Sequence, residues 1–199
     1  GAGNLLGDEQ SGHIKEVGFE LYQQMLEEAV LSLKAGLTDI VEDKWAPQIT
    51  IGTPVLIPED YVADLSVRLS LYRRLAEMED EREIDGFAAE MVDRFGPSPE
   101  EVGHLLSLVA IKALARRANV EKIDAGPKGA VISFRNDEFA DPQKLIAFIS
   151  ERGRDAKVRP DMKVVFLADW QEAEDRLKGT TAILRSLAGI ADKAKKKAA

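Results

Sequence analysis

A four-residue turn sequence, Gly126-Pro127-Lys128-Gly129, separates two short runs that contain Val, Ile, Phe and Ala. Such runs on either side of a Gly/Pro turn predict a β-hairpin with strands over 120–125 and 130–134. Apolar residues recur every three or four positions over 98–119 and again over 142–152, which predicts a helix on each side of the hairpin. A hairpin placed between helices limits the fold class, and we expect an α+β fold.

Two further stretches predict strands. Residues 49–57 contain Pro54, which favours an edge strand because Pro cannot donate a ladder hydrogen bond. The apolar run 163–167 predicts another strand. The sheet is therefore expected to have three or four short strands, mixed or antiparallel, and to pack with several helices.

Several helices are predicted outside the hairpin region. A long amphipathic helix in front of the sheet has an apolar face made by Ile14, Val17, Leu21, Met25, Ala29 and Leu33. A second helix is expected to begin at Pro58, to bury Tyr61, Leu65, Leu69, Tyr72 and Ala76, and to turn Arg68, Arg73 and Arg74 outward. A third covers 84–95 and ends at Gly96, and the last follows Glu172.

These elements predict four segments. The Gly-rich opening and the long helix occupy 1–36, where Gly36 provides a helix stop. Residues 37–49 lack a period and are expected to form a linker. The α+β domain covers 50–190, and the Lys-rich, low-complexity end at 191–199 is expected to be a flexible basic tail.

Composition excludes several kinds of site. The 199-residue chain has no Cys, which removes disulfides, thiolate zinc sites, iron–sulfur clusters and a cysteine nucleophile. No run approaches the ~18 apolar residues of a membrane span and no signal peptide opens the sequence, so a cytoplasmic location is expected. The net charge of −8 disfavours general nucleic-acid binding, because phosphate contacts need clustered Lys and Arg. A start at Gly1, without Met, leads us to expect a piece of a longer protein.

No catalytic residue is predicted from the sequence. The turn at 126–129 lacks the spacing and the Ser/Thr of a Walker A loop, and no Ser has a nucleophile-elbow context. His13 and His104 stand in no metal-ligand spacing, so a structural role is expected for each. A small hydrolase that uses His104 with nearby acids is an alternative, which burial of His104 away from any cleft would exclude.

Charge is distributed unevenly along the chain. Residues 77–93 contain eight acids and one base, whereas the chain from Arg176 onward contains seven bases and one acid. Solvated faces and a disordered tail account for such runs in many proteins. An acidic docking face is the alternative, because Glu90 and Asp93 are three residues apart and project together from a helix. Two such carboxylates suit an arginine-bearing partner.

The opening residues carry a family resemblance. The stretch GAGNLLGDEQSGHI, from Gly1 to Ile14, runs into EVGFELY at 16–22 and is similar to bacterial transcription-repair coupling factors. Later segments agree with the same family, namely LIPEDYV at 56–62, RLSLYRRL at 68–75 and DRFG at 93–96. The resemblance implies that 1–36 is the end of a translocation motif and that 50–190 is a C-terminal regulatory domain.

The resemblance also implies two interaction sites. Gln10 matches the functional glutamine of the translocation motif, in which a helical hairpin and a loop couple ATP hydrolysis to movement along DNA. Glu90 and Asp93 match two acids that contact arginines of an N-terminal UvrB-like domain in the same polypeptide. That contact is expected to hold this domain over the UvrA-binding surface, and so to keep the protein autoinhibited.

The longer protein implied by the resemblance is an ATP- and magnesium-dependent translocase on double-stranded DNA. It removes RNA polymerase stalled at lesions and recruits excision-repair proteins through UvrA. Its ATPase motifs would lie outside this chain, so we expect no catalytic residue, cofactor or metal in the chain itself. The residues leave a second class open, an accessory domain that binds nucleic acid through the basic C-terminal end.

Overall fold

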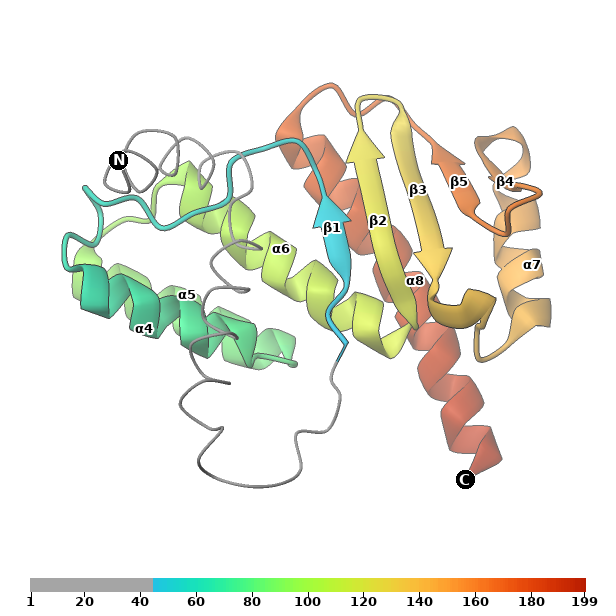
Figure 1. Cartoon of the computed structure of the whole chain (residues 1–199), viewed down its shortest axis with the longest axis horizontal. Coiled ribbons are helices and arrows are strands. Elements are labelled where there is room, and N and C mark those ends of the chain that lie inside the picture. Colours follow the sequence, from blue (N-terminus) through green and yellow to red (C-terminus); the bar gives the residue numbers. More distant parts are fainter. Residues whose placement is uncertain (1–44) are drawn as a thin grey trace, which may run out of the picture. The chain divides into compact units, whose positions relative to one another are not determined.

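The computed structural model describes residues 45–199 (Figure 1). Its elements in chain order are β1 (Gln48–Thr50), α4 (Leu65–Ala76), α5 (Glu81–Phe95), α6 (Glu100–Arg117), β2 (Val120–Gly126), β3 (Gly129–Phe134), α7 (Pro142–Glu151), β4 (Ala156–Val158), β5 (Val164–Leu167) and α8 (Ala173–Ala198). The α+β class is confirmed. The Gly-rich opening with Gln10 and the helix expected over 14–33 lie outside the described residues.

The chain folds into two compact units. In the described part, the first unit consists of Trp45 and 53–109, and the second of 46–52 and 110–199. This division differs from the expected single domain over 50–190. Strand β1 belongs to the second unit because it pairs with β2, and the boundary falls within helix α6.

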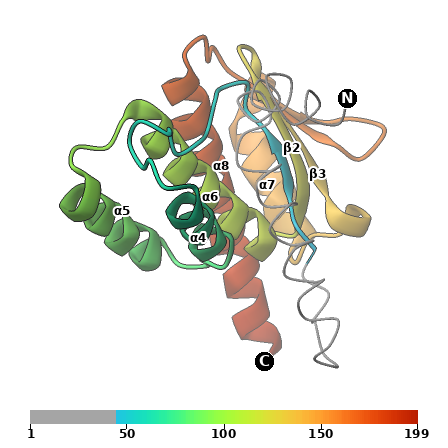
Figure 2. The ribbon, with the colours of Figure 1, turned by 60° about the vertical axis from the view of Figure 1, so that its left-hand side comes forward.

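The second unit is built on a five-stranded mixed sheet with the order β1-β2-β3-β5-β4. Strands β1 and β2 run parallel, and all other neighbours are antiparallel. One register row crosses four strands through Ile49, Ile123, Ile132 and Val164, and all four residues are buried. Helices α7 and α8 lie on one face of this sheet in both views (Figure 1, Figure 2). The row therefore belongs to the core between the sheet and its helices.

Two strands differ from the sequence-based expectation. The strand expected over 49–57 is only three residues long, and Pro54 follows it; β1 is nevertheless an edge strand, as Pro54 indicated. Strand β4 was not predicted, because Ala156–Val158 is too short to show an alternating pattern. It pairs with β5 at the other edge of the sheet and raises the strand count to five.

In the first unit, the helix expected to begin at Pro58 begins at Leu65, where the Asp64 side chain accepts a hydrogen bond from the amide of Val67. The predicted inner face was therefore wrong in part. Leu65 is exposed, whereas Arg68, expected to point outward, is buried. The Arg68 guanidinium donates to the carbonyl oxygens of Val62 and Ala63 at 2.7 and 3.0 Å. These bonds satisfy carbonyls of the turn before the helix, which a periodicity of apolar residues does not reveal.

The lysines at the end of the chain also differ from expectation, since they lie in the last turns of α8. Ala and Lys are strong helix formers, and cations are favourable near a helix C-terminus because of the helix dipole. The expected boundary at residue 190 therefore falls inside a helix. None of the helices in residues 45–199 has the length and apolar character needed to span a bilayer.

Candidate docking site on helix α5

Helix α5 carries the two acids that the sequence selected. It begins at Asp80, whose carboxylate accepts a hydrogen bond from the amide of Arg82, and it ends at Gly96. Its buried face is made by Ile84, Phe87 and Met91. Glu90 is half-buried and Asp93 is exposed, so both carboxylates lie at the surface of the first unit.

The C-terminal end of α5 is fixed by Tyr61. The Tyr61 hydroxyl lies 2.8 Å from the carbonyl oxygen of Gly96 and 3.1 Å from that of Met91. Its ring meets the ring of Phe95 edge to face, with centroids 5.8 Å apart. The single hydroxyl proton is donated to one of these two carbonyl oxygens, and the contact ties the turn around Tyr61 to the C-terminal end of α5, which carries Asp93.

Glu90 is held by two arginines of the same unit. Arg74, on α4, donates to both carboxylate oxygens, with Nη1–Oε2 and Nη2–Oε1 distances of 2.6 and 2.9 Å. Arg94, one turn further along α5, donates from Nη1 to Oε2 at 3.0 Å. The forked contact with Arg74 is the strong, directional form of an ion pair. The guanidinium of Arg74 also stacks 5.1 Å above the ring centre of Phe87.

This contact changes the acidity of the Glu90 carboxyl. Hydrogen bonds from Arg74 first, and from Arg94 second, lower the pKa of Glu90 from 4.5 to about 2. The hydrogen bond to Glu90 raises the pKa of Arg74. Glu90 therefore stays ionised through the whole physiological range, and it links α4 to α5.

The free energy of unfolding at low pH should depend on this contact between Glu90 and the two arginines. A carboxyl whose pKa is lowered on folding stabilises the protein above its unfolded pKa, and the stabilisation is lost as the pH falls through its folded pKa. We expect Glu90→Gln to lower the free energy of unfolding at pH 6, by about 1 kcal/mol or less because the group is partly exposed. The difference from wild type should shrink between about pH 4.5 and pH 2. Urea unfolding across that range measures this difference, and Asp93→Asn, which removes a neighbouring carboxylate that neither Arg74 nor Arg94 contacts, serves as the control.

Asp93 is in a different state from Glu90. Its side chain is exposed, and its carboxylate forms no hydrogen bond or ion pair with any residue in 45–199. The two acids were expected to face a partner together, three residues apart on one helix. The structure brings them to the same helix end but engages Glu90 within the unit, so Asp93 is the carboxylate that remains available to an external cation.

Sequence reasoning missed the two arginines that bind Glu90. Arg94 follows Glu90 by four residues, and this spacing alone indicates an ion pair on a helix. Arg74 gave no such signal, because its contact depends on how α4 packs against α5 within the unit. Together the three residues form a charged cluster, Arg74–Glu90–Arg94, with Asp93 beside it.

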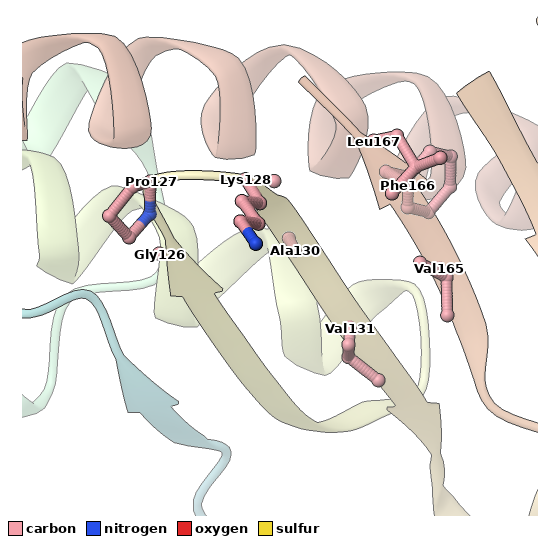
Figure 3. Close-up of a pocket in the computed structure, with 9 residues that line it drawn as sticks. Gly126, Pro127, Lys128, Ala130, Val131, Val165, Phe166 and Leu167 are labelled. Carbon is pink, nitrogen blue, oxygen red and sulfur yellow. The ribbon is translucent and has the colours of Figure 1, made fainter. Parts of the chain in front are cut away.

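His104, the residue of the hydrolase alternative, lies in α6. It is buried, with 8% exposure, and its Nε2 lies 3.7 Å from the Glu100 carboxylate on the preceding turn of α6. A hollow of about 340 Å³ lies elsewhere, over strands β3 and β5 and the turn between β2 and β3 (Figure 3). Its lining is apolar apart from the side chain of Lys128 and contains no histidine or acid. This hollow therefore does not support the hydrolase alternative, because His104 is not among its lining residues.

Comparison with known proteins gives the site a family context. A profile of the TRCF domain matches residues 51–145, a range that includes the whole of α4, α5 and α6. The transcription-repair-coupling factor of Rickettsia conorii is 44% identical over 168 residues, which cover 84% of this chain. The chain belongs to the transcription-repair-coupling factor family. The resemblance inferred from the opening residues and from 56–96 is confirmed.

Two other members of the family match more of the chain at lower identity. The transcription-repair-coupling factors of Haemophilus influenzae and Escherichia coli K12 are 36% and 33% identical over 94% of the chain. The chain spans only 15% of the Rickettsia protein, 17% of the Haemophilus protein and 16% of the Escherichia protein. A crystal structure of the C-terminal domain of transcription-repair coupling factor has the same fold, with a TM-score of 0.66 at 19% identity over 77% of this chain and 99% of that chain.

Proposed function

We propose that this chain acts as a regulatory domain of a transcription-repair-coupling factor, which docks on a UvrB-like domain of the same polypeptide and covers the UvrA-binding surface. Asp93 carries the proposal. An exposed carboxylate that has no partner within residues 45–199, placed on a helix end that Tyr61 holds in position, is suited to receive an arginine from another domain. Membership of the family supports the identity of that other domain.

The neighbouring cluster supports the same surface in a different way. The Glu90 carboxylate already accepts three hydrogen bonds from Arg74 and Arg94, so it fixes the two helices and the side chains around Asp93. In this proposal Glu90 is a positioning residue, and Asp93 makes the contact. This assigns separate roles to two acids that the family resemblance treats alike.

The expected affinity suits a contact between domains that can open. An exposed ion pair contributes only about 0.2–1 kcal/mol, which is too little for a stable complex between separate proteins. Domains joined in one chain, however, experience an effective concentration of up to about 1 mM. A contact with a dissociation constant somewhat below that value stays closed at rest, and it opens when the rest of the protein changes conformation.

The wider function follows from the family resemblance. The longer protein, in this proposal, is an ATP- and magnesium-dependent translocase on double-stranded DNA that removes stalled RNA polymerase and then recruits UvrA. Gln10, outside the described residues, would belong to its translocation motif. The chain itself has a regulatory role and no catalytic one.

The proposal is tested by mixing this chain with the UvrB-like domain of the same protein as a separate polypeptide. We expect a one-to-one complex whose dissociation constant lies below about 1 mM, because a weaker contact would not close even when tethered. The affinity should fall as salt is raised, since the contact depends on exposed charges. Isothermal titration calorimetry or NMR titration measures both. Absence of any complex at about 1 mM of each partner would contradict the proposal.

A further inference from the structure

The second unit carries a cluster of bases where two helices end. Lys195 of α8 donates from Nζ to the backbone oxygen of Arg117, the last residue of α6, at 3.2 Å. The Arg117 guanidinium in turn pairs with Asp192 of α8. These contacts bring the last turns of both helices together. We call the resulting cluster the basic helix ends, and its members are Arg116, Arg117, Lys193, Lys195, Lys196 and Lys197.

The charge of this cluster contrasts with the rest of the chain. The one acid in the same helix turns, Asp192, is already paired with Arg117. The adjoining turn, tied to α6 by hydrogen bonds from Asn119 to the carbonyls of Arg135 and Glu138, adds Arg135, Asp137 and Glu138. Seven bases thus stand against three acids in a chain whose net charge is −8. A local excess of this kind creates a positive potential even on an acidic protein.

Helix stabilisation does not account for all of these lysines. Cations near a helix C-terminus interact favourably with the helix dipole, but the effect falls off within the last turn. Lys195, Lys196 and Lys197 are consecutive, so their side chains leave the helix about 100° apart and cannot all serve one end. All four lysines of the cluster are exposed. Several charges therefore remain for a ligand.

The side chains around the lysines limit what that ligand can be. The residues between and after these lysines are Ala194, Ala198 and Ala199, with no aromatic or large apolar side chain. Insertion into a lipid surface needs such apolar groups, and so do the buried anchors of most protein interfaces. Single-stranded nucleic acid is bound largely by stacking on aromatic rings, which the last turn of α8 lacks. Exposed lysines without such neighbours suit a regular array of phosphates.

We propose that the basic helix ends bind the phosphate backbone of duplex nucleic acid without regard to sequence. The lysines act as point charges on phosphates, and phosphate contacts carry no direct sequence information. This activity goes beyond masking and uses neither Asp93 nor Glu90. Three to four neutralised phosphates give a binding constant that falls steeply with salt, with a slope of log K against log salt of about −3.

The test is a fluorescence anisotropy titration of the 199-residue chain against a labelled DNA duplex of about 20 base pairs, starting near 50 mM salt. We expect a dissociation constant of about 10–100 µM at the lowest salt, a slope near −3, and equal affinity for unrelated sequences. Replacing Lys193, Lys195, Lys196 and Lys197 together by Gln should weaken binding at least tenfold. Gln preserves helix propensity, and circular dichroism verifies that α8 is retained.

A matched control removes the same amount of charge elsewhere on the second unit. It replaces Lys122, Lys128, Lys157 and Lys178, all exposed, by Gln, and it should change the affinity less than threefold. No binding near 50 mM salt, or an equal loss in both variants, would overturn the proposal. Equal affinity for polyglutamate or for phosphatidylserine vesicles would also overturn it, because the site would then not be selective for nucleic-acid phosphates. Asp93→Arg should leave duplex binding intact, so failure here would not bear on the masking proposal.

Discussion

We expect Asp93→Arg to weaken the complex between this chain and the UvrB-like domain by tenfold or more. The substitution removes the one exposed carboxylate at the end of α5 that is unpaired within residues 45–199, and it places a cation opposite the partner's arginine. Like charges brought together at an interface cost considerably more than a lost attraction. A tenfold change corresponds to about 1.4 kcal/mol, which calorimetry resolves.

Two further variants distinguish a local contact at Asp93 from an effect of the overall charge of the chain. Asp85→Arg makes the same charge change on the same helix, about 12 Å along its axis, and should alter the affinity less than threefold. Glu90→Gln should also have a smaller effect than Asp93→Arg, since the Glu90 carboxylate is occupied by Arg74 and Arg94. An effect of Asp85→Arg equal to that of Asp93→Arg would mean that overall charge, and not a local contact, governs the complex.

We expect the largest loss of stability from Gly129→Ala, at the start of β3. The φ angle of Gly129 is +126°, which an L side chain rarely adopts, and a Cβ atom there would lie 1.9 Å from the backbone oxygen of Phe166. The nearest atoms belong to backbone, so no side chain can move aside. Backbone strain and overpacking each cost about 1–3 kcal/mol, so a loss of about 3–5 kcal/mol is expected.

The same hairpin provides the control for this substitution. Gly126 precedes the turn, and a Cβ added there meets no atom within 4 Å, so Gly126→Ala should change the free energy of unfolding by less than about 1 kcal/mol. Urea unfolding followed by circular dichroism measures both variants. If Gly129→Ala unfolds within about 1 kcal/mol of Gly126→Ala, then β3 and β5 do not approach each other as the structure describes.

The parts of the fold that were predictable are those with a local cause. The hairpin was predictable because Gly126 to Gly129 combine turn residues between two apolar runs. Helix α5 was predictable because Ile84, Phe87 and Met91 repeat at helical spacing. Asn119, the last residue of the helical range predicted over 98–119, has a φ angle of +61°, which Asn tolerates better than most residues. Each of these features depends on residues close together in sequence.

The parts that escaped prediction depend on distant residues. Arg68 was expected at the surface because charged residues usually lie there, yet carbonyls of the preceding turn hold it in the interior. Strand β4 exists because β5 provides a partner for three residues that have no strand pattern of their own. At the candidate site, Glu90 and Asp93 looked equivalent in the sequence, and only the packing of α4 against α5 brought Arg74 to one of them.

Competition between UvrA and this chain for the UvrB-like domain tests the central claim most directly. Labelled UvrB-like domain is first saturated with UvrA, and the unlabelled 199-residue chain is then added while the UvrA complex is measured by anisotropy. We expect the chain to displace UvrA in a concentration-dependent and salt-sensitive way, and the Asp93→Arg chain to require at least tenfold more protein for the same displacement. A ternary complex in which chain and UvrA bind the domain together would contradict masking.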